Sequence, residues 1–231
     1  MATYSNECSH FVLLSHPRTG SNFVHSALRS SSKVQMYHEL FADHVRVIGE
    51  DFDRILRRYL APPAPSIDTV GFKLFYRHLT DHEWNRIHAL ARLRYIRLIR
   101  RNPLRSIVSL AIAIKTDQWT LTPWDAEPKD KRVALDTANL VKGLDSVSAW
   151  ERWFELEFHD REILTICYED VVLDPRREFL RIENFLGVDD IDPNQIALRR
   201  QNPEPLSDLV SNFDEVRAVL ADSKYEKFLF E

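Results

Sequence analysis

The segment His10-Phe11-Val12-Leu13-Leu14-Ser15, continued by His16-Pro17-Arg18-Thr19-Gly20-Ser21-Asn22-Phe23, decides the fold of this chain. Its first six residues are an apolar run that is typical of a buried strand, and a proline then ends the run. Gly20 allows the backbone to bend close to a ligand, and helical spacing of apolar residues begins at Phe23. A turn that opens a helix presents free backbone N–H groups, and the helix dipole favours an anion there. The segment therefore predicts a strand, an anion-binding turn with Arg18 as a fixed charge, and a helix; the alternative is an ordinary corner with an exposed arginine.

This turn lacks the features of an ordinary ATP or GTP loop. A Walker A loop needs Gly-x-x-x-x-Gly-Lys followed by Ser or Thr. The turn here is shorter, has one glycine and carries an arginine, and no Ser or Thr follows a lysine to hold magnesium. We therefore expect a phosphate-binding turn of another kind, with no metal ion required.

Composition excludes several classes of protein. The chain has 231 residues, of which 44% are hydrophobic and 29% charged, as in a soluble globular protein. Its net charge of −4 gives no general attraction to nucleic acid or to acidic membranes, so any anion site must be local. No apolar run approaches the roughly 20 residues of a membrane span, and no signal peptide is evident. Cys8 and Cys167 have no metal-ligand spacing, and we expect reduced thiols in a cytoplasmic protein.

Apolar runs alternate with helical patterns along the chain, which predicts an α/β fold with a parallel sheet flanked by helices. The expected strands are residues 10–15, 34–37, 69–76, 95–99 and 163–168. One expected helix starts at the capping box Thr80–Glu83, and another starts at Pro103, directly after the N-cap Asn102. Further helices are expected over about 132–159 and from Pro175 to a C-terminal Gly187. Residues 117–131 contain two Trp and two Pro and predict an irregular loop or lid within a single domain over 1–231.

A second constellation consists of Arg101 and Ser109, eight residues apart at the start of a predicted helix. In a parallel sheet the C-terminal ends of the strands line one edge, where ligands bind, so we expect Arg101 to share that edge with the turn at Pro17–Asn22. Arginine grips a phosphate through two parallel hydrogen bonds, and a serine hydroxyl completes such a cradle. Taken alone, a solvated arginine at a helix start is the more economical interpretation.

Together the two constellations resemble the PAPS-dependent sulfotransferase family. The segment Pro17-Arg18-Thr19-Gly20-Ser21-Asn22, with Phe23 after it, looks like the family's 5′-phosphosulfate loop, and Arg101 with Ser109 looks like its 3′-phosphate site. A third match, Tyr168-Glu169-Asp170, is similar to a strand-to-helix element whose tyrosine lies near the adenine. The resemblance runs from about residue 10 to 220. It implies a three-layer P-loop-type fold, PAPS as co-substrate, adenosine 3′,5′-bisphosphate as product and no metal.

Within the family, the bacterial trehalose sulfotransferase-like branch looks most similar. The arginine in the first loop, the segment His38-Glu39-Leu40-Phe41 and the segment Lys115–Trp119 carry this resemblance. Dimers occur in that branch, so a homodimer is open here. The family's Arg-Lys-Gly segment near the C-terminus is absent as such, and Arg199-Arg200-Gln201-Asn202 is a loose substitute that makes Arg200 the candidate nucleotide contact.

The resemblance implies in-line attack of an acceptor hydroxyl on the sulfuryl group. Arg18 and the N–H groups of the turn would stabilise the charge that grows on the leaving phosphate. Glu39 is the first candidate for the base, since it aligns with the acidic residue proposed for this branch, and the alternative is a carboxylate that caps a helix or pairs with an arginine. The second candidate is His38, with His16 and His78 behind it, because imidazole has a suitable intrinsic pKa.

Two further groups have weaker signals. Lys73, in Gly71-Phe72-Lys73, matches a family lysine that contacts the transferred group, although a lysine on a half-exposed strand is often only solvated. Trp119 and Trp124 in the expected lid could stack on a sugar or pack against the fold.

The function that we predict is transfer of a sulfuryl group from PAPS to a hydroxyl of a small carbohydrate, glycolipid or other metabolite. One alternative is a nucleotide or sugar kinase with a degenerate phosphate loop, which would need magnesium and ATP. Another is a non-catalytic nucleotide-binding protein, which would tolerate the loss of Glu39 and Lys73.

Overall fold

The computed structural model describes residues 8–46, 51–61, 64–90 and 92–230. Contacts along the chain group these residues into two compact units. The first unit comprises the described residues up to Ile99 together with Asp160–Ile196, and the second comprises Arg100–His159 and the described residues from Ala197 onward. The single domain expected from the sequence stays a prediction.

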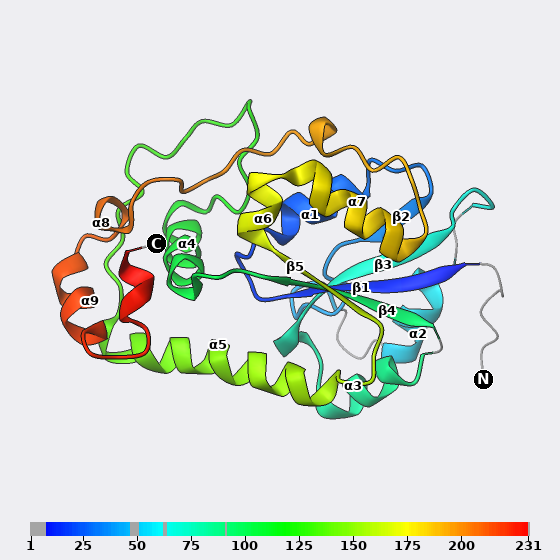
Figure 1. Ribbon diagram of the computed structural model, residues 1–231, viewed down its shortest axis with the longest axis horizontal. Helices are drawn as coiled ribbons and strands as arrows, with labels where there is room; N and C mark the ends of the chain where they lie inside the picture. Colours follow the sequence, from blue (N-terminus) through cyan, green and yellow to red (C-terminus); the bar gives the residue numbers. More distant parts are fainter. Residues whose placement is uncertain (1–7, 47–50, 62–63, 91, 231) are drawn as a thin grey trace. The chain divides into compact units, whose positions relative to one another are not determined.

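The first unit is built on a five-stranded sheet (Figure 1). Its strands are β1 (Ser9–Ser15), β2 (Val34–Tyr37), β3 (Thr69–Phe75), β4 (Leu93–Ile99) and β5 (Ile163–Cys167). They lie in the order β2-β3-β1-β4-β5, and every neighbouring pair is parallel. Ser15 at the end of β1 is in register with Phe75 of β3 and Leu98 of β4, so these three strands end at the same edge. The predicted parallel α/β fold is confirmed.

Helices cover both faces of this sheet and make three layers. Figure 1 shows α1 (Ser21–Leu28), α6 (Tyr168–Leu173) and α7 (Pro175–Leu186) over one face, and α2 (Phe52–Tyr59) and α3 (Asp81–His88) over the other. Successive side chains of a strand point to opposite faces, so a strand that helices cover on both faces buries apolar residues on both. The run Phe11–Leu14 of β1, which is fully buried, has this pattern. Phe11 and Leu13 of β1 pack with Val24 of α1 and with Phe179 and Ile182 of α7 in one core cluster.

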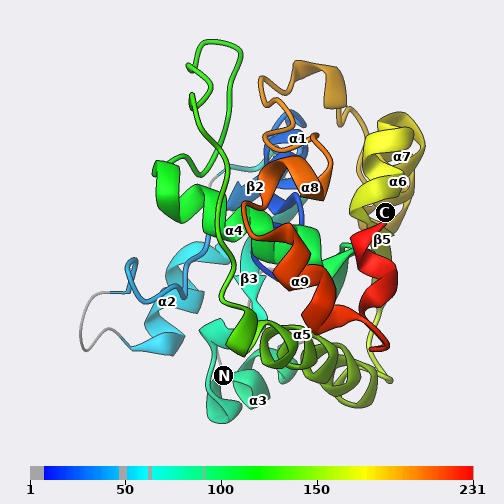
Figure 2. The same ribbon diagram turned by 90° about the vertical axis from the view of Figure 1, so that its left-hand side faces the viewer.

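The second unit is helical (Figure 2). Its helices are α4 (Pro103–Thr116), α5 (Thr137–Glu157), α8 (Leu206–Leu209) and α9 (Phe213–Leu220), with short 3₁₀ turns such as Glu226–Leu229. Their apolar faces form a second core cluster. The N-cap predicted for α4 is confirmed, because the Asn102 side chain accepts a hydrogen bond from the N–H of Arg105 at 3.1 Å.

The start of the long helix and the end of the last strand are among the element boundaries that differ from the sequence-based expectation. The long helix begins at Thr137 and not near residue 132, because Val133 forms a parallel bridge with Val210 and Asp136 then caps the helix by accepting from the N–H of Ala138. The last strand ends at Cys167, so Tyr168 is the first residue of α6. The capping box at Thr80 and Glu83 is confirmed. Among the helices described here, none has the length and apolar character to cross a membrane.

Candidate active site

The turn between β1 and α1 has the geometry of an anion site. Arg18 (φ 62°) and Gly20 (φ 87°) both adopt left-handed backbone conformations, which turn the chain sharply from the strand into the helix. Gly20 is the N-cap residue and has no side chain with which to cap the helix. The N–H groups of Phe23 and Val24 donate to the carbonyl of Gly20 at 3.0 and 3.3 Å. The backbone N–H groups in the first turn of a helix have no acceptor inside the helix. In α1 the backbone N–H groups of Ser21 and Asn22 are therefore the donors available to a bound anion.

Thr19 and Phe23 hold this turn in place through their side chains. Thr19 is buried, and its hydroxyl donates to the carbonyl of His16 at 2.9 Å, which closes the turn on itself. The ring of Phe23 packs against Phe179 of α7, with ring centroids 6.1 Å apart. These two side chains therefore stabilise the shape of the turn, and their predicted contact with the cofactor stays a prediction.

Tyr168 lies directly against the turn. A Cβ added at Gly20 would meet Cδ2 of Tyr168 at 2.4 Å and Cε2 at 2.8 Å, so the tyrosine ring packs on the Cα of Gly20. Both residues belong to the first unit. The sequence predicted that each contacts the nucleotide and missed that they contact each other, because a contact between residues so distant in the chain leaves no local signal.

Lys73 connects the turn to the segment that follows β2. Its ammonium donates to Oδ1 of Asn22 at 2.6 Å and pairs with Oε1 of Glu39 at 2.7 Å. The Lys73 side chain is only 4% exposed, and burial lowers the pKa of its ammonium, an effect that the nearby Glu39 carboxylate opposes. An unpaired buried ammonium would be very costly, so the two oxygen partners explain why a lysine is stable here. The structure thus brings together three residues that the sequence selected separately.

His78 faces the same carboxylate from the other side. It lies in the 3₁₀ turn η1 (Tyr76–His78) that follows β3. Its Nε2 is 3.7 Å from Oε2 of Glu39, and its Nδ1 accepts a hydrogen bond from the N–H of Phe75 at 3.2 Å. Burial lowers the pKa of His78 to about 4, so the ring is neutral at pH 7. Both carboxylate oxygens of Glu39 therefore face a nitrogen of the protein.

His38, the second candidate for the base, stacks on His25 of α1. Their ring centroids are 3.8 Å apart, and His25 is 1% exposed whereas His38 is exposed. Burial lowers the pKa of His38, with a further contribution from the Lys73 charge, and burial together with His38 lowers the pKa of His25 to about 3. Both imidazoles are therefore neutral at pH 7.

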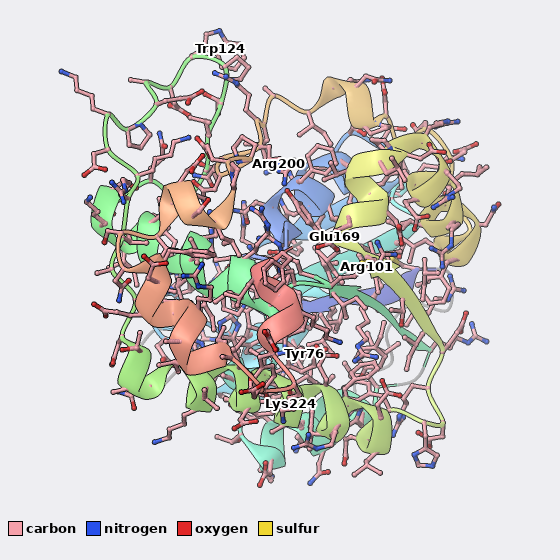
Figure 3. The ribbon with its side chains drawn as sticks, turned by 60° about the vertical axis from the view of Figure 1, so that its left-hand side comes forward. Tyr76, Arg101, Trp124, Glu169, Arg200 and Lys224 are labelled. Atoms are coloured by element: carbon pink, nitrogen blue, oxygen red, sulfur yellow. The ribbon has the colours of Figure 1, made fainter. Side chains whose placement is uncertain are left out.

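The other predicted nucleotide residues belong to the second unit. Ser109 is buried on α4, and Nδ2 of Asn202 donates to its hydroxyl oxygen at 3.2 Å. Arg101 and Arg200 are exposed and labelled in Figure 3. Asn202 is a further candidate residue that the sequence indicated only weakly, as the last member of the segment Arg199–Asn202. How the residues of the two units combine around a nucleotide stays a prediction.

The expected lid is tied to that same segment. The N–H of Arg199 donates to the carbonyl of Leu121 at 2.7 Å, and the Gln201 side chain donates to the carbonyl of Gln118 at 3.1 Å. Trp124 is 82% exposed at the tip of the segment (Figure 3), and Trp119 is 47% exposed. Neither tryptophan is part of the core, which leaves the predicted role in acceptor binding open.

Comparisons with known proteins agree with this reading of the residues. A model of the sulfotransferase family matches residues 84–193. The chain is 26% identical to nodulation protein H of Rhizobium meliloti (strain 1021), over 94% of each chain. It is 28% identical to nodulation protein H of Rhizobium tropici, over 94% of this chain and 92% of that one. A solved sulfotransferase from Alicyclobacillus acidocaldarius has a similar fold, with a TM-score of 0.58 and 15% identity over 99% of this chain and 96% of that one.

The matched region contains Arg101, Ser109 and Tyr168, three of the residues on which the sequence resemblance depends. The match favours sulfuryl transfer over the kinase alternative, while the trehalose sulfotransferase-like branch stays a prediction. Over residues 84–193 the chain is thus similar to the sulfotransferase family, and nearly its whole length is similar to nodulation protein H.

Proposed function

We propose that this protein is a sulfotransferase that moves a sulfuryl group from PAPS to a hydroxyl of a small carbohydrate, glycolipid or other metabolite, with Glu39 as the base. The observation that carries the proposal is the chain of contacts Asn22–Lys73–Glu39, at 2.6 and 2.7 Å. It links the anion-binding turn, where the donor's 5′-phosphosulfate would bind, to the carboxylate that would receive the acceptor's proton.

The turn supplies the donors for the leaving group. As the acceptor oxygen bonds to sulfur and the bond from sulfur to the 5′-phosphate breaks, negative charge grows on the bridging oxygen. The N–H groups of Ser21 and Asn22 and the side chain of Arg18 would stabilise that charge without reorganising, and removal of one such donor typically costs about 100- to 1,000-fold in rate. The product of the donor is adenosine 3′,5′-bisphosphate.

Glu39 and Lys73 act on the other side of the sulfur. The Glu39 carboxylate takes the proton of the acceptor hydroxyl as the new bond forms, a role that contributes about 100- to 10,000-fold. Lys73 holds the carboxylate near the turn and, as the sequence resemblance implies, would contact the transferred group. From the sequence motif, Arg101 and Ser109 would hold the 3′-phosphate, with Tyr168 near the adenine and Arg200 as a further contact.

The test uses the purified protein with labelled PAPS, offered with cell extracts and with a panel of sugars and glycolipids, and mass spectrometry to find the added sulfuryl group. We expect a sulfated product and stoichiometric adenosine 3′,5′-bisphosphate. ATP with magnesium is the matched control, since a kinase would transfer phosphate from it. Absence of any sulfated product, together with phosphate transfer from ATP, would refute the proposal.

A further inference from the structure

We propose that His78 is a positioning residue, which donates a hydrogen bond from Nε2 to the Glu39 carboxylate and thereby orients this base toward the acceptor hydroxyl. The inference rests on the proposed function of Glu39. It assigns a role to a residue whose chemistry the transfer mechanism described above does not use.

The backbone fixes the tautomer of His78. Its Nδ1 accepts from the N–H of Phe75 at 3.2 Å, so that nitrogen carries no proton. A neutral imidazole has one N–H, which must then be on Nε2, the nitrogen that lies 3.7 Å from Oε2 of Glu39. Hydrogen bonds of catalytic groups are commonly long without substrate and shorten in the complex.

The same geometry excludes His78 as the base itself. Its one lone-pair nitrogen is occupied by the Phe75 N–H, and its other nitrogen already carries a proton. The ring can donate to Glu39 but cannot accept a proton from a hydroxyl in this tautomer. Among the histidines that the sequence offered as alternatives to Glu39, His78 is therefore reassigned from base to support of the base.

The surroundings keep the ring neutral and in place. Its side chain is 7% exposed, and the ring lies against that of Phe75, with centroids 4.9 Å apart. The carbonyl of His78 accepts from the Arg46 guanidinium at 3.1 Å, and Arg46 in turn pairs with Glu83 at 2.7 Å, so the backbone of the turn is anchored to the start of α3.

The charged groups around the ring oppose one another. Glu39 and Asp43 favour a protonated imidazole, whereas Arg77 and Lys73 disfavour it, and burial has the largest influence and lowers the pKa. Lys73 already places one positive charge on the Glu39 carboxylate, through its other oxygen. A neutral imidazole can orient the carboxylate without adding a second charge that would lower its basicity.

The tautomer of His78 can be measured by NMR, without an assay of sulfuryl transfer. Long-range proton–nitrogen NMR spectra of imidazole-labelled protein should show His78 as neutral, with its proton on Nε2, at pH 7 and at pH 5. A proton on Nδ1, or a charged ring at pH 7, would overturn the proposal. This readout is independent of the reaction, so it separates failure of the His78 role from failure of the proposed function.

Kinetics test the consequence. His78→Phe keeps the ring packing and removes the donor, and we expect kcat to fall about 10- to 100-fold with the KM for PAPS within about twofold, since orientation of the base is lost and donor binding is not. The acidic limb of the kcat–pH profile should move to higher pH, because the carboxylate loses a hydrogen bond that favours its charged form.

His78→Gln, which keeps an N–H donor, should recover part of the loss in kcat. His82→Phe, at an exposed histidine of α3, is the control. Equal losses in His78→Phe and His78→Gln, with an unmoved pH profile, would mean that the residue acts only in packing.

Discussion

The ring of Tyr168 packs on Gly20 so closely that a Cβ at position 20 would come within 2.4 Å of Cδ2. This contact joins the end of β5 to the anion-binding turn after β1. Two features therefore favour glycine at position 20. The backbone there is left-handed, and the tyrosine ring occupies the space that a side chain would need.

Gly20→Ala should disrupt the turn more than its backbone conformation alone explains. A left-handed alanine costs about 1–2 kcal/mol, and the clash with Tyr168 adds to that value. Gly187→Ala is a matched control, because Gly187 also has a positive φ, of 72°, but has open space where its Cβ would lie. Urea unfolding should show a larger loss of stability for Gly20→Ala. The double variant with Tyr168→Ala should regain part of it; equal losses at the two glycines and strict additivity would contradict the contact.

Lys73→Met should reduce both stability and transfer. The substitution leaves the Glu39 carboxylate without its ammonium partner. Removing one partner of a fully buried ion pair costs about 3–5 kcal/mol of stability. The loss should be smaller here, because the Glu39 side chain is 20% exposed and water can solvate the unpaired carboxylate. Lys33→Met, in the solvent-exposed pair with Asp189, should change stability far less. Combining Lys73→Met with Glu39→Gln should cost less than the sum of the single changes. Additive losses would show that the two residues do not depend on each other.

His25→Leu should make the protein less sensitive to acid. The pKa of His25 is lowered from 6.5 to about 3 in the folded protein, and its buried Nε2 has no hydrogen-bond partner. The unfolded chain then binds more protons than the folded one between these values, so stability is full above pH 6.5 and is lost as the pH falls toward 3. Lowering the pH from 7 to 5 should reduce the free energy of unfolding by about 2 kcal/mol through this histidine alone. Chemical unfolding at the two pH values should show that loss in the wild type and a loss smaller by about that amount in His25→Leu, and identical losses would contradict the account.

Arg101→Ala should weaken the binding of adenosine 3′,5′-bisphosphate by about tenfold or more, since a charge-assisted contact to phosphate contributes about 1.5–3 kcal/mol. Asn202→Ala should have a smaller effect, because Asn202 acts through Ser109, to whose hydroxyl it donates. Arg152→Ala, at an exposed arginine of α5, is the control for loss of one positive charge. Calorimetry that gave the same affinity for Arg101→Ala and Arg152→Ala would remove Arg101 from the nucleotide site.

The sequence predicted the strands well, because each is an apolar run bounded by clear turn or capping residues. Asn102 with Pro103 and Thr80 with Glu83 marked helix starts through chemistry that is entirely local. The start of α5 was wrong because the bridge between Val133 and Val210 depends on a partner far along the chain.

The candidate site was predictable as a set of residues and not as an arrangement. Local patterns selected Asn22, Glu39 and Lys73, but only the parallel pairing of β1, β2 and β3 brings the ends of these segments together. The packing of Tyr168 on Gly20 and the approach of His78 to Glu39 arise from tertiary structure alone. No spacing rule in the sequence indicates either contact.

The most direct test of Glu39 as the base is sulfuryl transfer by Glu39→Gln, measured beside calorimetric binding of adenosine 3′,5′-bisphosphate. Glutamine has nearly the same shape but cannot take the proton, so we expect transfer from labelled PAPS to fall by about 100-fold or more with nucleotide affinity within about twofold. Glu162→Gln, at an exposed glutamate of the same unit, should leave both values unchanged. Near-normal transfer by Glu39→Gln with intact nucleotide binding would contradict the account and direct attention to His38.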